Sequence, residues 1–98
     1  MCFMDRFWFD EYIKPRLSGY SFEYSKFVRG DFGDLERIEL EGLGKLGTVE
    51  FWSQGWVGLD VYDCACDDQV MNVLLSPEEK GSVLREFEKF IGVLTQGG

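Results

Sequence analysis

The period of the apolar residues changes along the chain, and each period predicts a different element. In "MCFMDRFWFDEYIKPRL" the large apolar residues recur at helical spacing, as Met4, Phe7, Trp8 and Tyr12. We therefore expect a helix over about Phe3–Lys14, with Pro15 marking where it ends or bends. The following "GYSFEYSKFVRGDFGD" mixes brief alternation with Gly and Asp, and fits either a loose strand or an ordered loop.

From Leu35 onward the apolar residues alternate, which is the period of a strand with one buried face. The alternation runs through "LERIELEG", "GTVEFWS" and "WVGLDVYDC", with a glycine-rich hairpin loop at "GLGKLG" and a short turn at "SQG". A fourth run, "QVMNVLLS", is nearly all apolar, as in a strand covered on both faces. Because turns this short join antiparallel neighbours, the four runs predict a meander.

The segment "SPEEKGSVLREFEKFIGVL" predicts a helix that begins with a capping box, with Ser76 as N-cap, Pro77 at the first position and Glu79 three residues after the serine. Its apolar stripe would lie on the sheet and consists of Val83, Leu84, Phe87, Phe90, Ile91 and Leu94. The 98 residues thus predict a single α+β domain of two layers: an N-terminal helix, a four-stranded antiparallel meander, and a C-terminal helix packed on the sheet.

The charge of the chain is negative and unevenly distributed. There are 18 Asp and Glu against 10 Lys and Arg, a net charge of −8. Residues 1–33 carry five acids and five bases, whereas residues 46–79 carry seven acids and no base. Nucleic acids and anionic membranes are bound through Lys and Arg, so this distribution argues against both as direct partners. It favours encounter with a basic protein.

Residues suited to catalysis are scarce. The chain has no His, the commonest general base and metal ligand. Cys64 and Cys66 lie among four aspartates, which disfavour the thiolate, and "DCACDD" has the spacing of neither a zinc site nor a calcium loop. "GDFGD" and "GLGKLG" lack the ending of a phosphate loop. We therefore expect a protein that is not an enzyme and that uses no metal or cofactor.

The cysteines and the start of the chain bear on the compartment. Cys2, Cys64 and Cys66 are odd in number, and the spacing of the last two places them on one strand face, which argues against a disulfide framework. The opening residues have no signal-peptide pattern, and no run reaches the roughly 18 apolar residues of a membrane span. These features predict a reduced, cytoplasmic protein.

The strand period divides the predicted sheet into two faces. The face toward the helices would hold Ile38, Leu40, Val49, Phe51, Leu59 and Val61. The opposite face would gather Glu39, Glu41, Glu50, Trp52, Asp60 and Tyr62. Carboxylates beside aromatic side chains are typical of protein–protein contacts. Trp52 and Tyr62 fit a buried core as well as they fit an interface, because both faces of an α+β sheet can be covered. Asp63 joins the outer face only if the strand ends or bulges there.

The stretch "RIELEGLGKLGTVEFWSQGWVGLDVYDCACDDQVMNVLLSPEE" resembles small bacterial immunity proteins, which are encoded beside toxins of contact-dependent growth inhibition and related polymorphic toxin systems. The similar features are an acidic strand, a glycine hairpin, an "FWSxGWVGLDVY"-like strand pair, an "NVLLSPEE"-like junction and a Phe-rich closing helix. They cover about Leu35–Leu94.

The resemblance implies an inhibitor without enzyme activity that binds a cognate toxin domain, often a tRNA-cleaving nuclease, and blocks its basic groove. It implies Arg and Lys acceptors at Glu39, Glu41, Glu50 and Asp60, an anchor at Trp52, and rim charges at Asp67 and Asp68. The charge pattern alone also fits a generic acidic interaction or adaptor domain with another basic partner. A metal-binding or catalytic use of Cys64 and Cys66 is the remaining alternative.

Overall fold

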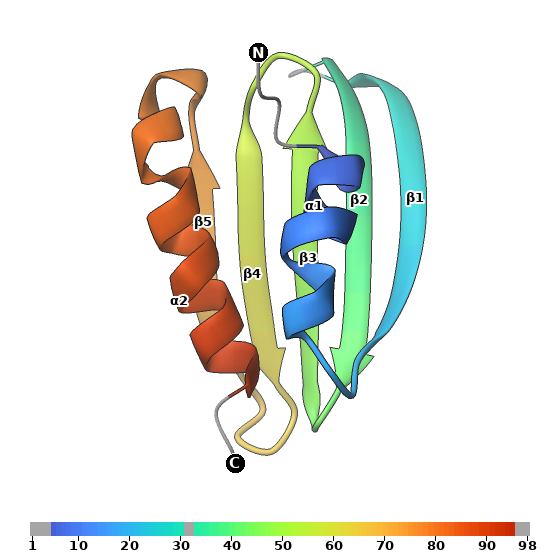
Figure 1. The fold of residues 1–98 in the computed structure, drawn as a ribbon, viewed down its shortest axis with the longest axis vertical. Helices are drawn as coiled ribbons and strands as arrows, with labels where there is room; N and C mark the ends of the chain where they lie inside the picture. The colour runs from blue at the N-terminus through green and yellow to red at the C-terminus, as the bar shows by residue number, and fades with distance from the viewer. Residues whose placement is uncertain (1–4, 31–32, 96–98) are drawn as a thin grey trace.

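The structure is a computed structural model of the chain and describes residues 5–30 and 33–95. In this part of the chain an antiparallel sheet has the order β1-β2-β3-β4-β5 and is formed by β1 (Ser21–Gly30), β2 (Gly33–Gly42), β3 (Lys45–Trp52), β4 (Val57–Asp63) and β5 (Asp68–Leu75). The helices α1 (Arg6–Tyr12) and α2 (Val83–Thr95) lie on the same face of the sheet (Figure 1). The predicted α+β class, with a helix before and after an antiparallel meander, is confirmed.

The prediction of four strands is one strand short. The segment that fitted either a strand or a loop is β1, which pairs with β2 from Ser21 opposite Glu41 to Phe27 opposite Leu35. Its alternation is weak in the sequence because β1 lies at the edge of the sheet. Its inward side chains, including Phe22, are only partly buried against the core.

The core lies between the sheet and the helices. The six strand residues predicted to face the helices are all buried: Ile38, Leu40, Val49, Phe51, Leu59 and Val61. The buried residues of α2 are Val83, Phe87, Phe90, Ile91 and Leu94. Only Leu84 of the predicted α2 stripe is exposed. Burying an apolar side chain of this size stabilises the fold by about 1.5–3 kcal/mol, so this layer contact supplies most of the driving force.

The N-terminal helix is shorter than predicted. Asp5 caps α1 by accepting a hydrogen bond from the Trp8 backbone N–H at 3.0 Å. The helix ends at Tyr12, and Pro15 lies in the short 3-10 helix η1 (Lys14–Arg16) that follows. The predicted start at Phe3 lies outside the described residues.

The buried face of α1 also differs from the prediction. Phe9 and Ile13 are buried in the core, whereas Phe7 and Tyr12 of the predicted stripe are exposed. Trp8 is half-buried and packs edge-on against Phe87 of α2, with 5.0 Å between the ring centroids. Aromatic residues occur on several faces of this helix, so their spacing in the sequence alone did not identify the face that meets the sheet. The predicted stripe residue Met4 lies outside the described residues.

The prediction that β5 is covered on both faces is wrong. This strand is the second edge of the sheet, and Leu74 is 51% exposed on the face away from the helices. The junction after β5 agrees better with the prediction, because the Ser76 N–H donates to the Glu79 carboxylate at 2.9 Å. The capped turn is a 3-10 helix, η2 (Pro77–Ser82), and the α-helix begins only at Val83.

The turn between β2 and β3 fixes the register of the strands. Leu43 and Gly44 both have positive φ, 51° and 76°, which is the backbone of a two-residue type I′ turn. The loop is therefore shorter than the predicted "GLGKLG". The register that follows puts Arg37 opposite Glu50 and Glu39 opposite Thr48.

Candidate protein-binding face

The sheet face opposite the helices is called here the open face, because α1 and α2 both lie on the other side (Figure 1). Residues of opposite parity to the buried Ile38, Val49 and Leu59 point to it. The structure brings the six predicted outward residues together on this face: Glu39, Glu41, Glu50, Trp52, Asp60 and Tyr62.

Four carboxylates occupy one end of the open face, which we call the acidic half: Glu23, Glu39, Glu41 and Asp60. Glu23 lies opposite Glu39, Glu39 opposite Thr48, and Thr48 opposite Asp60, so three of the acids stand in one row across the strands. Together with Leu46 and Tyr62, among other residues, they line a groove of about 620 Å³. None of the described residues that line it is Lys or Arg.

Sequence reasoning missed one member of the acidic half. Glu23 belongs to β1, and the segment was not assigned as a strand, so its side chain had no predicted face. The signal was present in "SFEY", where Phe22 and Tyr24 alternate with Ser21 and Glu23.

Asp60 is the most enclosed of these carboxylates. Burial, and then the nearby charge of Glu50, raise the pKa of Asp60 above its ordinary value, and a hydrogen bond with Thr48 only partly offsets them. A positive charge placed in the groove would favour the ionised form of Asp60. The floor of the groove is therefore suited to a cation.

Glu50 is less available than its predicted role requires. Arg37 donates from Nε to Glu50 Oε2 at 2.8 Å and from a terminal nitrogen to the same oxygen at 2.8 Å. The Arg37 guanidinium also lies over the Phe27 ring, 4.9 Å from its centroid. This internal ion pair neutralises the middle of the open face, so Glu50 offers a partner less charge than Glu39 or Asp60 does. The pairing follows from the strand register that the turn at Leu43–Gly44 fixes in the structure.

The other end of the open face is apolar, and we call it the apolar half: Phe27, Leu35, Trp52 and Leu74. Phe27, Leu35 and Trp52 are neighbours on β1, β2 and β3. The Trp52 ring extends over Gly58, where an added Cβ would stand 3.3 Å from Cζ3, and Leu74 pairs with Gly58. Trp52 thus lies half-buried on the open face rather than beneath α1.

The predicted rim charges lie at the hairpin between β4 and β5. The Tyr62 hydroxyl donates to the Asp67 carboxylate, which ties Asp67 to the edge of the acidic half. Asp68 begins β5 and is exposed. Neither carboxylate lines the groove, and only Asp67 is joined to it, through Tyr62.

The spacing of Cys64 and Cys66 predicted that both lie on one strand face, and this prediction is wrong. β4 ends at Asp63, and Cys64 and Cys66 are exposed, free thiols of the turn that follows. The Ala65 N–H donates to Asp63 at 2.9 Å and lowers the pKa of that carboxyl. A hydrogen bond with Asp63, together with desolvation and its charge, raises the pKa of the Cys66 thiol. Cys2 lies outside the described residues.

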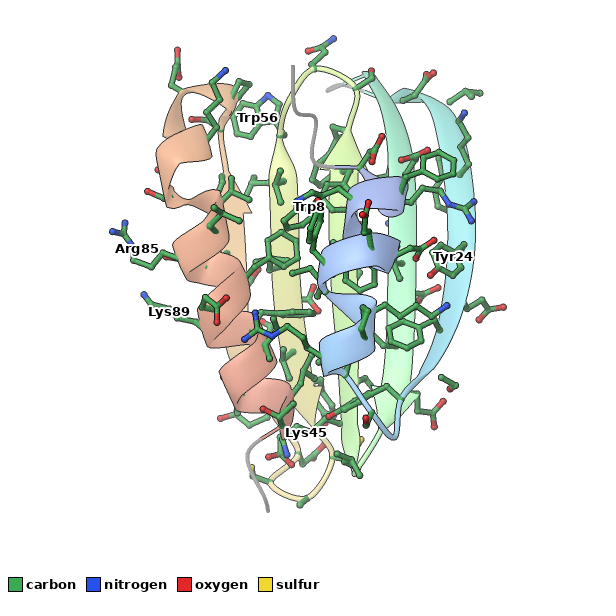
Figure 2. All side chains as sticks on the ribbon, in the orientation of Figure 1. Trp8, Tyr24, Lys45, Trp56, Arg85 and Lys89 are labelled. Atoms are coloured by element: carbon green, nitrogen blue, oxygen red, sulfur yellow. The ribbon has the colours of Figure 1, made fainter. Side chains whose placement is uncertain are left out.

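Other parts of the fold offer less chemistry. Trp56 lies beside η2 at one end of the molecule (Figure 2), where it helps line a second hollow of about 660 Å³ with Pro77 and Val57. In residues 5–30 and 33–95, no group of three or more Cys, Asp or Glu could hold a metal ion. Over the same ranges, α1 and α2 included, we find no helix of the length and apolarity that a bilayer crossing needs.

Comparison of the chain with protein-family models, with curated proteins and with solved structures finds no match. Function is therefore inferred from the open face itself.

Proposed function

We propose that this protein is an immunity protein, which binds a basic toxin domain through the open face and occludes the groove where that toxin holds its substrate. The observation that carries the proposal is the acidic half. Its four carboxylates come from three strands and surround one groove, and the ion pairs of the described residues involve none of them. A nuclease groove binds phosphates through Arg and Lys, and these carboxylates would form ion pairs with the same Arg and Lys side chains.

The arrangement of the acids supports a binding role over a purely structural one. Glu23 and Glu39 are directly opposite on neighbouring strands, where like charges destabilise an antiparallel pair. Asp60 is held in a partly buried position that disfavours its charge. A partner that supplies Arg or Lys relieves both costs at once, because the attraction is formed only in the complex.

The chemistry of the described residues supports an inhibitor rather than an enzyme. The chain contains no His, and the aspartate beside Cys66 disfavours its thiolate. The described residues that line the groove of the acidic half include hydroxyl groups beside the carboxylates but no Cys, Lys or Arg. Its chemistry is therefore ionic recognition.

The proposed role predicts a toxin domain encoded next to the gene for this chain, and the test uses that domain. We expect wild-type protein to bind it with a dissociation constant of about 1 nM or tighter, near −12 kcal/mol, and to abolish its activity at equimolar amounts. The double variant Glu39→Gln with Asp60→Asn should weaken binding about 100-fold, mainly by slowing association. Stopped-flow association at several salt concentrations should show a shallower salt dependence for this variant.

The matched control is Glu11→Gln with Glu78→Gln, which removes the same two charges from exposed positions on the helix side. It should stay within about 3-fold of wild type. Equal losses in both variants would show that only net charge matters and would favour a generic acidic adaptor. Full neutralisation of the toxin by the Glu39→Gln, Asp60→Asn variant would refute the proposed binding face.

A further inference from the structure

The chemistry of the open face changes along the strands rather than across them. On β2 and β3 the sequence of neighbouring pairs is Leu35 with Trp52, then Arg37 with Glu50, then Glu39 with Thr48. A strand rises about 3.3 Å per residue, so Leu35 and Glu39 are separated by about 13 Å. The face therefore has an apolar end and an acidic end at a fixed separation.

The apolar half has the properties of an anchor site. Phe27 is 47% exposed and lies opposite Leu35, and Leu74 is 51% exposed and lies opposite Gly58, over which the Trp52 ring extends. Leu35 is buried although it faces away from the helices, because large side chains flank it. An apolar side chain of a partner that settles here would contact aromatic rings on a preformed surface.

The pair between the two ends gives the face a direction. Arg37 and Glu50 neutralise each other, and the guanidinium lies over Phe27, at the border of the apolar half. A partner cation placed beside the neutral Arg37–Glu50 pair gains little net attraction, whereas the same cation two residues further along β2 meets Glu39, with Glu23 and Asp60 in the same row. The favourable positions for positive charge are thus confined to one end.

From this division we infer that the open face recognises its partner at two points about 13 Å apart: an apolar side chain seated on the apolar half, and a pair of arginines seated among Glu23, Glu39 and Asp60. The inference rests on the proposed function and specifies the chemistry of the toxin surface. Arginine suits the acidic end because its planar guanidinium binds carboxylates through two parallel hydrogen bonds.

A second copy of this chain fits the face poorly. Each copy carries a net charge of −8, and stacking two open faces in the same direction would place the acidic halves against each other. A basic partner meets no such repulsion, and charge complementarity selects it.

The first experiment uses peptides as probes of the purified protein. Two helical peptides of equal composition carry one Leu and two Arg. The two Arg follow the Leu by seven and eleven residues, about 13.5 Å away on average, or by three and four residues, about 5 Å away, so in both peptides they lie on the same helix face as the Leu. We expect the wider spacing to bind at least about 10-fold more tightly, with amide shift changes at both Phe27 and Glu39 in NMR spectra. Equal affinities, or shift changes confined to one half or to the helix layer, would overturn the inference.

Variants of the two halves complete the test. Phe27→Ala with Leu74→Ala should remove the preference for the wider spacing, and both side chains are exposed, so the fold should persist and its NMR spectrum should remain dispersed. In complex with the toxin domain, this variant should dissociate about 10-fold faster with an unchanged salt dependence. Retention of the spacing preference in the variant would contradict the anchor site.

The outcomes separate the inference from the proposed function. Spacing-dependent peptide binding without any toxin binding would leave the two-point surface standing and reject the immunity role. Tight toxin binding without any spacing dependence would support the immunity role and reject the two-point surface. Shifts at the open face that depend on the concentration of the free protein would identify a second copy as the occupant and overturn the inference.

Discussion

Glu23 of β1 and Glu39 of β2 lie directly opposite each other on the open face, and neither belongs to an ion pair formed among the described residues. Because like charges in this position repel, we predict that Glu39→Gln stabilises the free protein, raising the midpoint of thermal unfolding by about 2 °C, while it weakens partner binding. Thermal unfolding followed by circular dichroism measures the first effect.

The repulsion also predicts a salt effect. Added salt should stabilise wild type more than Glu39→Gln, since screening acts on the pair that the variant lacks. Glu11→Gln, at an exposed position on α1, is the control. A variant that is less stable than wild type at every salt concentration would show that the Glu39 carboxylate has a favourable partner.

Tyr20 is hydrogen-bonded to the last turn of α2. Its hydroxyl donates to the backbone carbonyl of Leu94 at 2.6 Å, in a partly buried position. Tyr20→Phe should therefore lower the free energy of unfolding by about 1 kcal/mol, because the carbonyl loses its donor. Urea denaturation measures the change, and Tyr12→Phe, whose side chain is exposed, should leave it unaltered within error. A loss of the same size in both variants would place the effect outside this hydrogen bond.

Replacement of Gly47 and of Gly92 by alanine should change the stability of the fold in opposite directions. A Cβ on Gly47 would stand 2.1 Å from Leu40 Cδ1 and 3.4 Å from Phe90 Cζ, both in the buried core, so Gly47→Ala should destabilise the fold by about 1–3 kcal/mol. Gly92 lies in α2 with nothing within 4 Å, and Gly92→Ala should stabilise by up to about 1 kcal/mol. Urea midpoints of the two variants should therefore lie on either side of the wild-type value.

Asp60 and Asp63 should give opposite pH dependences of stability, although they lie three residues apart. Burial and the charge of Glu50 raise the pKa of Asp60, so the folded state holds that proton more tightly, and stability falls as pH rises through the folded pKa. The Ala65 N–H lowers the pKa of Asp63, so its contribution is full above the unfolded pKa and is lost as pH falls through the folded one.

Substitution by asparagine checks both signs. At pH 7, Asp60→Asn should be more stable than wild type and Asp63→Asn less stable. Each difference should shrink as the pH falls below both the folded and the unfolded pKa of that carboxyl, which for Asp63 requires the lower pH because its folded pKa is lowered. Carbon NMR titration of the side-chain carboxyls should place the inflection of Asp60 above that of Asp63. A reversed order would contradict the assignment of causes.

The division of the sheet into two faces was predictable from the sequence, because a period of two leaves no choice once Ile38, Val49 and Leu59 point inward. The number of strands was not, since β1 is an edge strand whose inward Phe22 is only partly buried and whose pattern is correspondingly weak. For the same reason the sequence predicted Glu39 and Asp60 as outward acids but not Glu23.

The helix contacts show a different limit. Apolar spacing identified α2 well, where only Leu84 departs from the buried stripe, but failed for α1, where Phe7 was chosen and Phe9 is the buried residue. In a segment with so many aromatic residues, several faces are apolar, and the sheet decides which one is used. The ion pair between Arg37 and Glu50 needed the strand register, which the composition of the loop left undetermined.

Every strand of this sheet pairs with the strand next to it in the chain, since the spatial order is the order of synthesis. Each hairpin can therefore close a short loop before the next one forms, and little loop-closure entropy is lost in assembling the sheet. Such local pairing favours rapid folding relative to barrels and sandwiches of similar length. In the proposed immunity role this speed is useful, because the protein can bind its partner only after the open face has formed.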